Sequence, residues 1–350
     1  MPDLRPTAPY DALLIVSFGG PERPEEVVPF LQNVTRGRDI PQERLVEVGQ
    51  HYFGFAGKSP INDINRSLIR ALEADFVGIG LDLPIYWGNR NSDPFLSEAV
   101  SKMIADGVSR AICFVTSAYS SYSSCRQYRE DLFEASTGLP ITLDRLRQHF
   151  NHPTFIDLYT EYTAAAIAEV GPNPEVVFVT HSIPTPMNEA SGGPGCGLYL
   201  RQHHDAADEV ASRLGLSDWT LAFCSRSGLP QHPWLEPDIN DHLEDLAGGG
   251  ATDVVLVPIG FVADHMEVIY DLDVEAKATA QRLGLRFARA ASPNADSRYA
   301  AMIRELVLER AAAERGETPT RRSVGLLGAK ADTCAIDCCV NPRSNRAVIS

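Results

Sequence analysis

The chain has 350 residues, 44% of them hydrophobic, so it can bury a full core and is not a small disulfide-stapled scaffold. Its 46 Asp and Glu residues outnumber its 31 Lys and Arg residues, and the net charge of -15 has the wrong sign for a protein that tracks phosphates. The N-terminus lacks a secretory pattern, and no stretch is apolar enough to span a bilayer. We therefore expect a cytoplasmic, monomeric protein without a nucleic-acid partner or a transmembrane segment.

Short β-branched and aliphatic runs alternate with longer segments of helical periodicity along the chain. The expected strands are residues 12–18, 82–87, 111–117, 175–180, 220–223 and 253–258, and the clearest helices are residues 62–75, 151–170 and 237–246. This alternation is typical of parallel strands joined by crossover helices. The predicted fold class is therefore α/β.

The two halves of the sequence resemble each other. Residues 13–21 (LLIVSFGGP) and residues 176–184 (VVFVTHSIP) both show a buried strand that ends in a turn before a proline, and residues 112–119 match residues 254–261. The repeat predicts two Rossmann-like lobes, each with a four-stranded parallel sheet, at residues 1–150 and 151–315. A C-terminal extension with little regular structure is expected at residues 316–350. In such sheets the ligand binds beyond the carboxyl ends of the strands, so we expect the site in a cleft between the lobes.

His181 follows the predicted strand at residues 175–180. A single histidine is more often a hydrogen-bonded structural residue than a ligand. Its position at a strand end that faces the cleft favours a functional role, because a neutral imidazole there can accept a proton or bind a divalent metal.

An acidic row follows the strand at residues 253–258, where residues 260–275 are expected to begin a helix. Glu267, Asp271 and Glu275 are four residues apart, a spacing that places their carboxylates along one helix face. A solvated acidic face is the alternative interpretation. If the row is buried in the cleft, its raised pKa values suit it to pass protons or to steer a hard cation.

Two further groups of side chains each have more than one possible role. Residues 116–126 form a hydroxyl-rich loop that either caps a helix or binds carboxylates of a ligand. Three cysteines cluster near the C-terminus, and a Cys-ligated cluster or a structural zinc needs a fourth thiolate. Cys125 is the first choice for that ligand and Cys196 the second, while free or regulatory thiols are the alternative.

Six motifs, taken together and in order, resemble those of ferrochelatases. They are residues 17–21 (SFGGP), 57–60 (GKSP), 119–123 (YSSYS), 180–184 (THSIP), 233–235 (PWL) and 260–267 (GFVADHME). The chain is most similar to the actinobacterial type that acts on coproporphyrin III. The resemblance implies insertion of Fe²⁺ into that porphyrin to give coproheme in haem biosynthesis, with a downstream coproheme decarboxylase as a partner. The alternatives are a protoporphyrin IX ferrochelatase, a cobalt or sirohydrochlorin chelatase, and a two-lobed tetrapyrrole- or metal-binding protein without catalysis.

The resemblance also implies roles for particular residues. The catalytic pair falls on His181 and Glu267, and both are implied metal contacts. Further metal contacts on the inner acidic line are implied for Asp264, His265, Asp271 and Glu275. Porphyrin contacts are implied for Phe18, Tyr52, Ser59, Tyr119, Ser120, Tyr122 and Trp234. A [2Fe-2S] cluster, which some family members hold, is implied on Cys125, Cys334, Cys338 and Cys339.

One departure from the family pattern concerns the axial side of the metal. Close relatives carry a tyrosine where this chain has Phe18. A phenyl ring cannot bind iron, so we expect a water or no ligand at that position.

Overall fold

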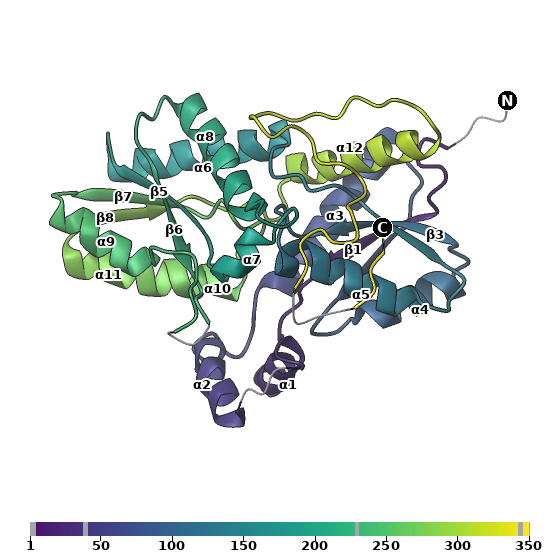
Figure 1. Cartoon of the computed structure of the whole chain (residues 1–350), viewed down its shortest axis with the longest axis horizontal. Coiled ribbons are helices and arrows are strands. Elements are labelled where there is room, and N and C mark those ends of the chain that lie inside the picture. Colours follow the sequence, from purple (N-terminus) through teal and green to yellow (C-terminus); the bar gives the residue numbers. More distant parts are fainter. Residues whose placement is uncertain (1–4, 38–40, 228–230, 342–345, 350) are drawn as a thin grey trace.

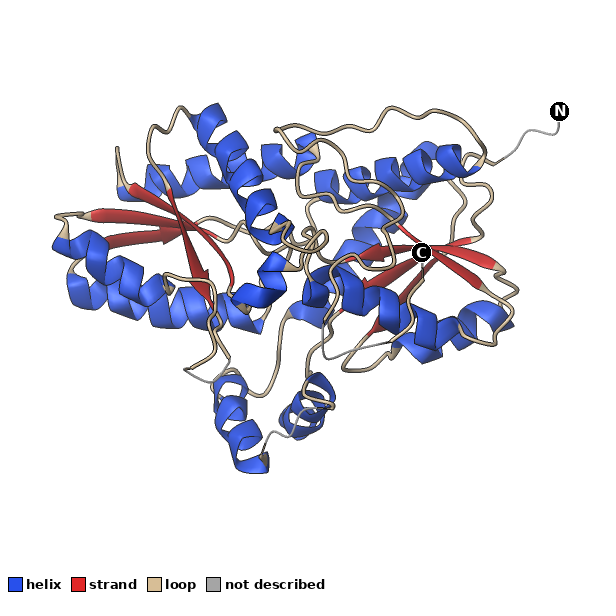
Figure 2. Ribbon diagram, viewed as in Figure 1, coloured by secondary structure: helices blue, strands red, loops and turns tan. Residues whose placement is uncertain are grey.

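Two α/β lobes lie side by side in the molecule (Figure 1). The computed structural model describes residues 5–37, 41–227, 231–341 and 346–349. Helices cover both faces of each sheet (Figure 2), so the strands are buried on both sides. This explains why the strand sequences are continuous apolar runs rather than alternating ones.

The first lobe holds a parallel sheet of four strands in the order β2-β1-β3-β4. Leu13 of the central strand lies opposite Ile85 on one side and Ile112 on the other. The strands are β1 (Ala12–Ser17), β2 (Ile85–Asn89), β3 (Arg110–Val115) and β4 (Thr142–Arg145). The helices are α1 (Pro24–Val34), α2 (Gln42–Phe53), α3 (Ile61–Ile79), α4 (Leu96–Ala105), the π-helix η1 (Tyr122–Arg126) and α5 (Gln127–Ser136).

The second lobe repeats this arrangement with the strand order β6-β5-β7-β8, again parallel. Its strands are β5 (Glu175–His181), β6 (Thr220–Cys224), β7 (Asp253–Val257) and β8 (Arg286–Arg289). The remaining helices are α6 (Pro153–Val170), α7 (Thr185–Glu189), α8 (Leu198–Leu214), α9 (Ile239–Gly248), α10 (Met266–Val268), the π-helix η2 (Ile269–Ala276), α11 (Lys277–Leu283) and α12 (Ser297–Glu314). The matching strand orders confirm the predicted fold class.

The six expected strands are present, but two edge strands were not recognised as strands in the sequence. β4 reads TLDR and β8 reads RFAR, so neither has the apolar run that identified the others. The helix expected directly after β7 begins only at Met266. Residues 258–265 form a turn instead, in which the backbone N–H of Asp264 donates to the side-chain oxygen of Asn294 at 2.8 Å.

The last helix crosses back to the first lobe. α12 packs along α3, and the Nε of Arg304 donates to the Asp75 carboxylate at 2.6 Å. The range 151–315 expected for the second lobe therefore contributes its final helix to the packing of the first. After it, the described residues of the extension at 316–350 contain no helix or strand, as expected, and the chain returns past α5 (yellow in Figure 1).

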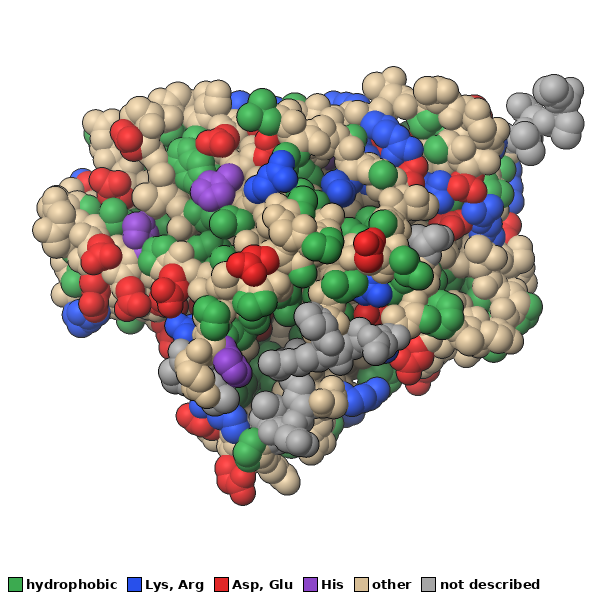
Figure 3. All heavy atoms as spheres, in the orientation of Figure 1, with side chains coloured by type: hydrophobic (Ala, Val, Ile, Leu, Met, Phe, Trp, Pro, Cys, Tyr) green, Lys and Arg blue, Asp and Glu red, His purple; other side chains and the backbone are tan. Residues whose placement is uncertain are grey.

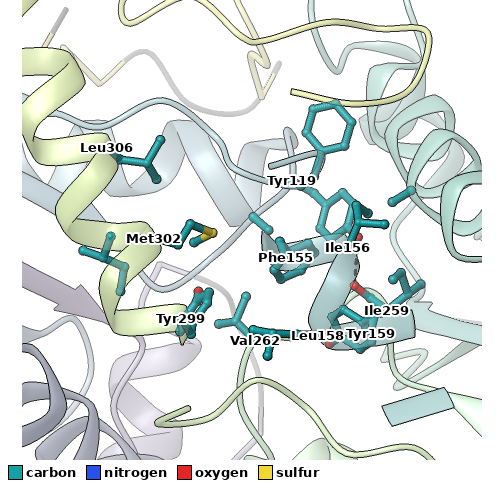
Figure 4. Close-up of a cluster of buried hydrophobic side chains, with 14 of the residues drawn as sticks. Tyr119, Phe155, Ile156, Leu158, Tyr159, Ile259, Val262, Tyr299, Met302 and Leu306 are labelled. Atoms are coloured by element: carbon teal, nitrogen blue, oxygen red, sulfur yellow. Dashed lines mark hydrogen bonds between the residues drawn. The ribbon is translucent and has the colours of Figure 1, made fainter. Parts of the chain in front are cut away.

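A single aromatic core joins the two lobes (Figure 4). Tyr119, Phe155, Tyr159 and Tyr299 are all buried within it. The Tyr159 hydroxyl donates to the carbonyl of Pro258 at 2.8 Å, which ties α6 to the end of β7. Burial of each such ring stabilises the fold by roughly 1.5–3 kcal/mol, so the lobes are held together at the base of the space between them.

Candidate functional site

His181 is the last residue of β5, where the strand emerges from the second sheet. Its Nδ1 lies within hydrogen-bond distance of the carbonyl oxygen of Ser182. A carbonyl only accepts, so Nδ1 carries the hydrogen and the neutral ring presents the lone pair of Nε2. That nitrogen lies 3.8 Å from the carboxylate of Glu267.

His181 and Glu267 form an electrostatic pair that is open to solvent. The exposed fractions of the two side chains are 32% and 47%. Burial alone would lower the pKa of His181, but the Glu267 carboxylate outweighs it and raises the pKa above its ordinary value. Burial would raise the pKa of Glu267, yet the His181 charge lowers it to about 2. The carboxylate is therefore ionised at neutral pH, and the imidazole has a raised proton affinity.

The acidic row lies on the helix that Glu267 begins, and much of it is a π-helix rather than an α-helix. Hydrogen bonds in a π-helix run from i to i+5, so residues four or five apart still follow one face. Burial, followed by the charges of Glu267 and Glu275, raises the pKa of Asp271 to about 7, although a hydrogen bond from the Ser225 hydroxyl partly opposes this. Glu275 is exposed. The row therefore runs from His181 toward solvent.

Asp264 and His265 lie in the turn that leads to this helix. Both oxygens of Asp264 are already engaged, one by Arg289 at 2.9 Å and the other by Asn294 at 2.7 Å. The ring nitrogen Nδ1 of His265 accepts from the backbone N–H of Glu267 at 3.2 Å and so caps the helix. Burial lowers the pKa of His265. In this structure the two residues position Glu267, and the contacts of Asp264 are those of a structural residue.

Aromatic side chains from the first lobe face the acidic row. Phe18 packs edge-on against Phe30, with ring centroids 6.0 Å apart. Burial and then the charges of Glu267 and Asp271 raise the pKa of Tyr52 above its ordinary value.

α2 also meets the acidic helix directly. His51 stacks on Tyr270 of η2 at a centroid distance of 3.9 Å. On the second lobe, the half-buried Trp234 bridges to Pro184, three residues after His181. The two lobes thus approach each other around His181 and Glu267.

Four expected porphyrin contacts are buried by the protein itself. The Tyr119 hydroxyl donates to the carbonyl of Ile259 at 2.8 Å, and that of Tyr122 donates to Glu130 at 3.0 Å. Ser120 donates its backbone N–H to Gln202 at 2.7 Å, and Ser59 is only 3% exposed. In this structure the four residues are therefore covered by the protein itself, and their contact with a porphyrin stays a prediction.

A cavity of about 400 Å³ opens beside β5. Ser182, Phe223, Arg226, Leu235 and Asp238 are among the residues that line it. Arg226 was not expected at this site, although a basic residue shortly after β6 was the available signal in the sequence. Acidic side chains gather on the second lobe over α9 and α11 (red in Figure 3), and such a field attracts cations.

The structure brings four cysteines together. Cys334 interacts through its thiol with both Cys125 and Cys338, and Cys339 interacts with the same two residues. The sulfurs of Cys338 and Cys339 are 3.6 Å apart. These contacts close a ring of four thiols and raise the pKa of Cys338 to about 11, chiefly through its hydrogen bond with Cys334.

Cys196 stands apart from this ring. Its sulfur accepts from Arg201 at 3.7 Å, and no hydrogen bond joins it to another sulfur within the part of the chain that the structure describes. Over the same residues, no group of three or more His, Cys, Asp or Glu side chains is arranged to hold a single metal ion. A [2Fe-2S] cluster differs from such a site because each of its irons takes only two protein thiolates.

Nitrogen donors surround the thiol ring. The Nη1 of Arg145 donates to Cys125 at 3.0 Å, the Nε2 of Gln148 donates to the same sulfur at 2.7 Å, and the backbone N–H of Gly192 donates to Cys339 at 3.2 Å. Such donors stabilise metal-bound thiolates, so the residues present fit an iron–sulfur group. Arg145 was not expected near the cysteines, because it lies on the edge strand β4, which the sequence does not reveal as a strand.

The two four-stranded parallel sheets and the helices around them form a chelatase-like fold. Among solved structures, SirB from Bacillus subtilis with Fe³⁺ has a TM-score of 0.52 at 12% identity and covers 89% of this chain and 99% of its own. The sirohydrochlorin chelatase SirB from Bacillus subtilis subspecies spizizenii, in complex with cobalt, has a TM-score of 0.51 at 10% identity, covering 87% of this chain and 97% of its own. At these identities the likeness shows the fold alone.

The sequence comparisons are more specific. The family model "Ferrochelatase" matches residues 10–311, and the chain belongs to this family of metal chelatases. It is 52% identical to "Coproporphyrin III ferrochelatase" of Streptomyces coelicolor over 97% of this chain and 96% of the relative. A protein of the same name in Frankia alni is 47% identical over 97% of this chain and 89% of the relative. None of the helices in the described ranges is long and apolar enough to cross a membrane.

Proposed function

We propose that this protein inserts Fe²⁺ into coproporphyrin III and releases iron coproporphyrin III. The observation that carries the proposal is the approach of His181 Nε2 to the Glu267 carboxylate, 3.8 Å apart at the cleft-facing end of β5. The identity of about half the residues to proteins named coproporphyrin III ferrochelatase supports the choice of porphyrin. The product would then serve a coproheme decarboxylase in the cytoplasm.

Two pyrrole protons must leave the porphyrin when the metal occupies the ring centre, and His181 is proposed to accept them one at a time, passing the first on toward solvent before it takes the second. The Ser182 carbonyl holds the hydrogen of the neutral imidazole on Nδ1, which leaves Nε2 free to take a proton. The imidazolium that forms gains a favourable interaction with the ionised Glu267. Proton transfer from the porphyrin is therefore favoured at the atom that faces the carboxylate.

The remaining acidic row is proposed to exchange protons with solvent or to deliver iron. Asp271 has a pKa of about 7 and so gains and loses protons near neutral pH. Glu275 lies at the exposed end of the row. Fe²⁺ accepts both imidazole and carboxylate ligands at modest affinity, which suits a path that must release the ion into the ring.

Phe18, Tyr52 and Trp234 are proposed as the walls of the porphyrin site, because all three are only partly buried around the pair. Ser59, Tyr119, Ser120 and Tyr122 are proposed to support those walls, since they are buried and most are hydrogen bonded within the protein. Phe18 leaves the face that it covers without a protein ligand for iron.

Anaerobic metallation assays test the function directly. Coproporphyrin III, protoporphyrin IX and sirohydrochlorin are offered in parallel, each with Fe²⁺ and with Co²⁺, and insertion is followed by the change in the porphyrin absorption spectrum. We expect the fastest turnover for coproporphyrin III with Fe²⁺. Turnover restricted to sirohydrochlorin would overturn the proposal and favour the chelatase class that shares the fold.

We also propose that Cys125, Cys334, Cys338 and Cys339 bind a [2Fe-2S] cluster. The ring of four thiols and the nitrogen donors around it support this ligand set over one that includes Cys196. When bound, such a group carries one electron reversibly and cross-links the segments that supply its ligands. Visible absorbance, iron and acid-labile sulfide of anaerobically purified protein test it, and colourless protein without either element would refute it.

A further inference from the structure

Two buried arginines beside the thiol ring have no carboxylate partner among the described side chains. Arg145 on β4 is 4% exposed and Arg129 on α5 is 1% exposed. Arg145 donates to the sulfurs of Cys125 and Cys334, while Arg129 donates to the carbonyls of Cys334 and Ile349. Among the residues that the structure describes, neither guanidinium forms an ion pair.

A third buried arginine nearby is paired with a carboxylate, as buried cations usually are. Arg126 on η1 is also buried, but its Nε lies 3.2 Å from the carboxylate of Glu130. That pair is neutral overall. The contrast leaves Arg129 and Arg145 as two positive charges that no acidic side chain in the described ranges offsets.

Backbone carbonyls compensate a buried cation only weakly, and cysteines compensate it fully only as thiolates. An uncompensated charge inside a protein costs several kcal/mol, and buried cations are accordingly paired. Moreover, the Nε of Arg145 and the Nη1 of Arg129 are buried donors that find no hydrogen-bond partner in the described part of the chain. Both observations point to an anionic group that belongs between these side chains and the cysteines.

We propose that Arg129 and Arg145 are the counter-charges of the metal centre on the four cysteines, where they hold the centre and raise its reduction potential. The inference rests on the proposed [2Fe-2S] cluster. With four thiolates, two sulfides and two ferric ions, the oxidised cluster carries a formal charge of about -2, which the two guanidinium groups neutralise. Reduction adds one negative charge, and nearby cations favour that more negative state.

The position of the arginines also explains how the extension at residues 316–350 is held. The tail returns past α5 (Figure 1), where Arg129 donates to the backbone carbonyl of Ile349 at 2.9 Å and Arg126 donates to that of Cys338 at 3.2 Å. The same face of the first lobe therefore binds the tail backbone and supplies charge to the thiolates. Such positioning residues act through the cysteines and do not touch the porphyrin site.

Arg145→Gln tests the proposal, because it keeps a hydrogen-bond donor and removes the charge. We expect the visible absorbance of the purified variant to bleach several-fold faster in air than that of the wild type, and its midpoint potential to be lower. Arg145→Lys keeps the charge but cannot donate to two sulfurs with the fixed geometry of a guanidinium. Its bleaching rate and midpoint potential should lie between those of the wild type and Arg145→Gln. Arg129→Gln should change both readouts in the same direction and provides a second measurement if Arg145→Gln does not fold.

Arg304→Gln is the matched control, because it removes a partly buried arginine whose partner is Asp75 rather than a cysteine. It should leave absorbance and potential unchanged. Coloured Arg145→Gln and Arg129→Gln proteins with the potential and bleaching rate of the wild type would overturn the counter-charge role alone. Wild-type protein without iron and sulfide would overturn the cluster and the counter-charges together, while its iron-insertion assay reports separately on the ferrochelatase function.

Discussion

The two lobes share one topology but end their equivalent strands in different chemistry. In the sequence repeat, Phe18 after β1 corresponds to His181 at the end of β5. The first lobe thus places an aromatic ring where the second places an imidazole. The first lobe also supplies Cys125, and the second supplies the acidic row that begins at Glu267.

The difference between the lobes lies in the residues beyond the strand ends and not in the sheets that support them. The sheets are interchangeable scaffolds, because the buried strands only have to pack against helices on both faces. The residues just beyond the strand ends are free of that demand and determine what each lobe does. In the proposed mechanism one lobe therefore provides a wall and the other provides the acid–base groups.

We expect the largest loss of iron insertion when the imidazole of the second lobe is removed. His181→Ala should lower iron insertion about 100- to 10,000-fold, because the proton acceptor is lost. Porphyrin binding, measured by fluorescence titration, should persist. His242→Ala removes another imidazole of the same lobe, which pairs with Thr220, and should leave insertion unchanged. Full activity of His181→Ala would eliminate the proposed mechanism.

A second experiment asks which lobe supplies the fourth thiolate. Cys125→Ser and Cys338→Ser should abolish the visible absorbance of purified protein, because each removes one thiol from the ring. Cys196→Ser in the second lobe should retain the colour, since its thiol contacts Arg201. The reverse pattern would assign the internal ligand to the second lobe.

Replacing the carboxylate beside His181 should have an intermediate effect and a defined pH signature. Glu267→Gln is expected to lower kcat about 10- to 100-fold. Loss of the anion lowers the pKa of His181, because the interaction that opposes burial is removed. Neutral His181 then persists to lower pH, so the acidic limb of the kcat/KM profile should shift downward. Glu244→Gln, which removes an exposed carboxylate paired with Arg282, should leave the profile in place.

The wall of the first lobe should matter for binding more than for chemistry. Phe18→Ala removes a ring that packs against Phe30 and should raise KM roughly tenfold with kcat within about twofold of the wild type. Steady-state kinetics with coproporphyrin III measure both quantities. A large fall in kcat without a change in KM would assign Phe18 a role in the reaction itself.

The smallest expected effect concerns stability. The pKa of Asp271 is raised to about 7, so the folded state binds its proton more tightly than the unfolded state. Protonated Asp271 therefore contributes to the free energy of unfolding, and this contribution is lost as the pH rises through the raised pKa. Asp271→Asn, which carries no charge, should be more stable than the wild type by roughly 4 kcal/mol at pH 8 and by less than half of that at pH 5. Denaturant unfolding at both pH values measures it, and an equal difference at both would contradict the raised pKa.

Much of this architecture was predictable from local sequence. The fully buried β1 (ALLIVS) and β7 (DVVLV) are apolar runs, and the residues that follow them carry the turn and motif signals. The edge strands β4 and β8 were not predictable, because their arginines and aspartate resemble a loop. Their strand character comes from hydrogen bonding to a neighbouring strand that is distant in sequence.

The candidate site divides in the same way. His181 and Glu267 stand next to their strand and helix in the sequence, so their proximity to the cleft follows from topology. The burial of Tyr119 against His203 does not follow from the strand order. His203 lies on α8, and α8 reaches the Tyr119 ring only through packing between the lobes. The packing of α12 against α3 in the first lobe is likewise not predictable from the strand order.

The sequence by itself thus determined the fold class and the repeat, and it singled out His181 and Glu267 as the proposed catalytic pair, since each of these features is encoded by residues that are neighbours along the chain. Only the tertiary structure decided that the acidic row forms a π-helix, that the Ser- and Tyr-rich loop turns inward, and that Arg145 converges with Cys125 and Cys334. These outcomes depend on which surfaces meet across long separations in sequence. Side-chain packing and the need to satisfy buried polar groups settle that choice, and no local pattern records it.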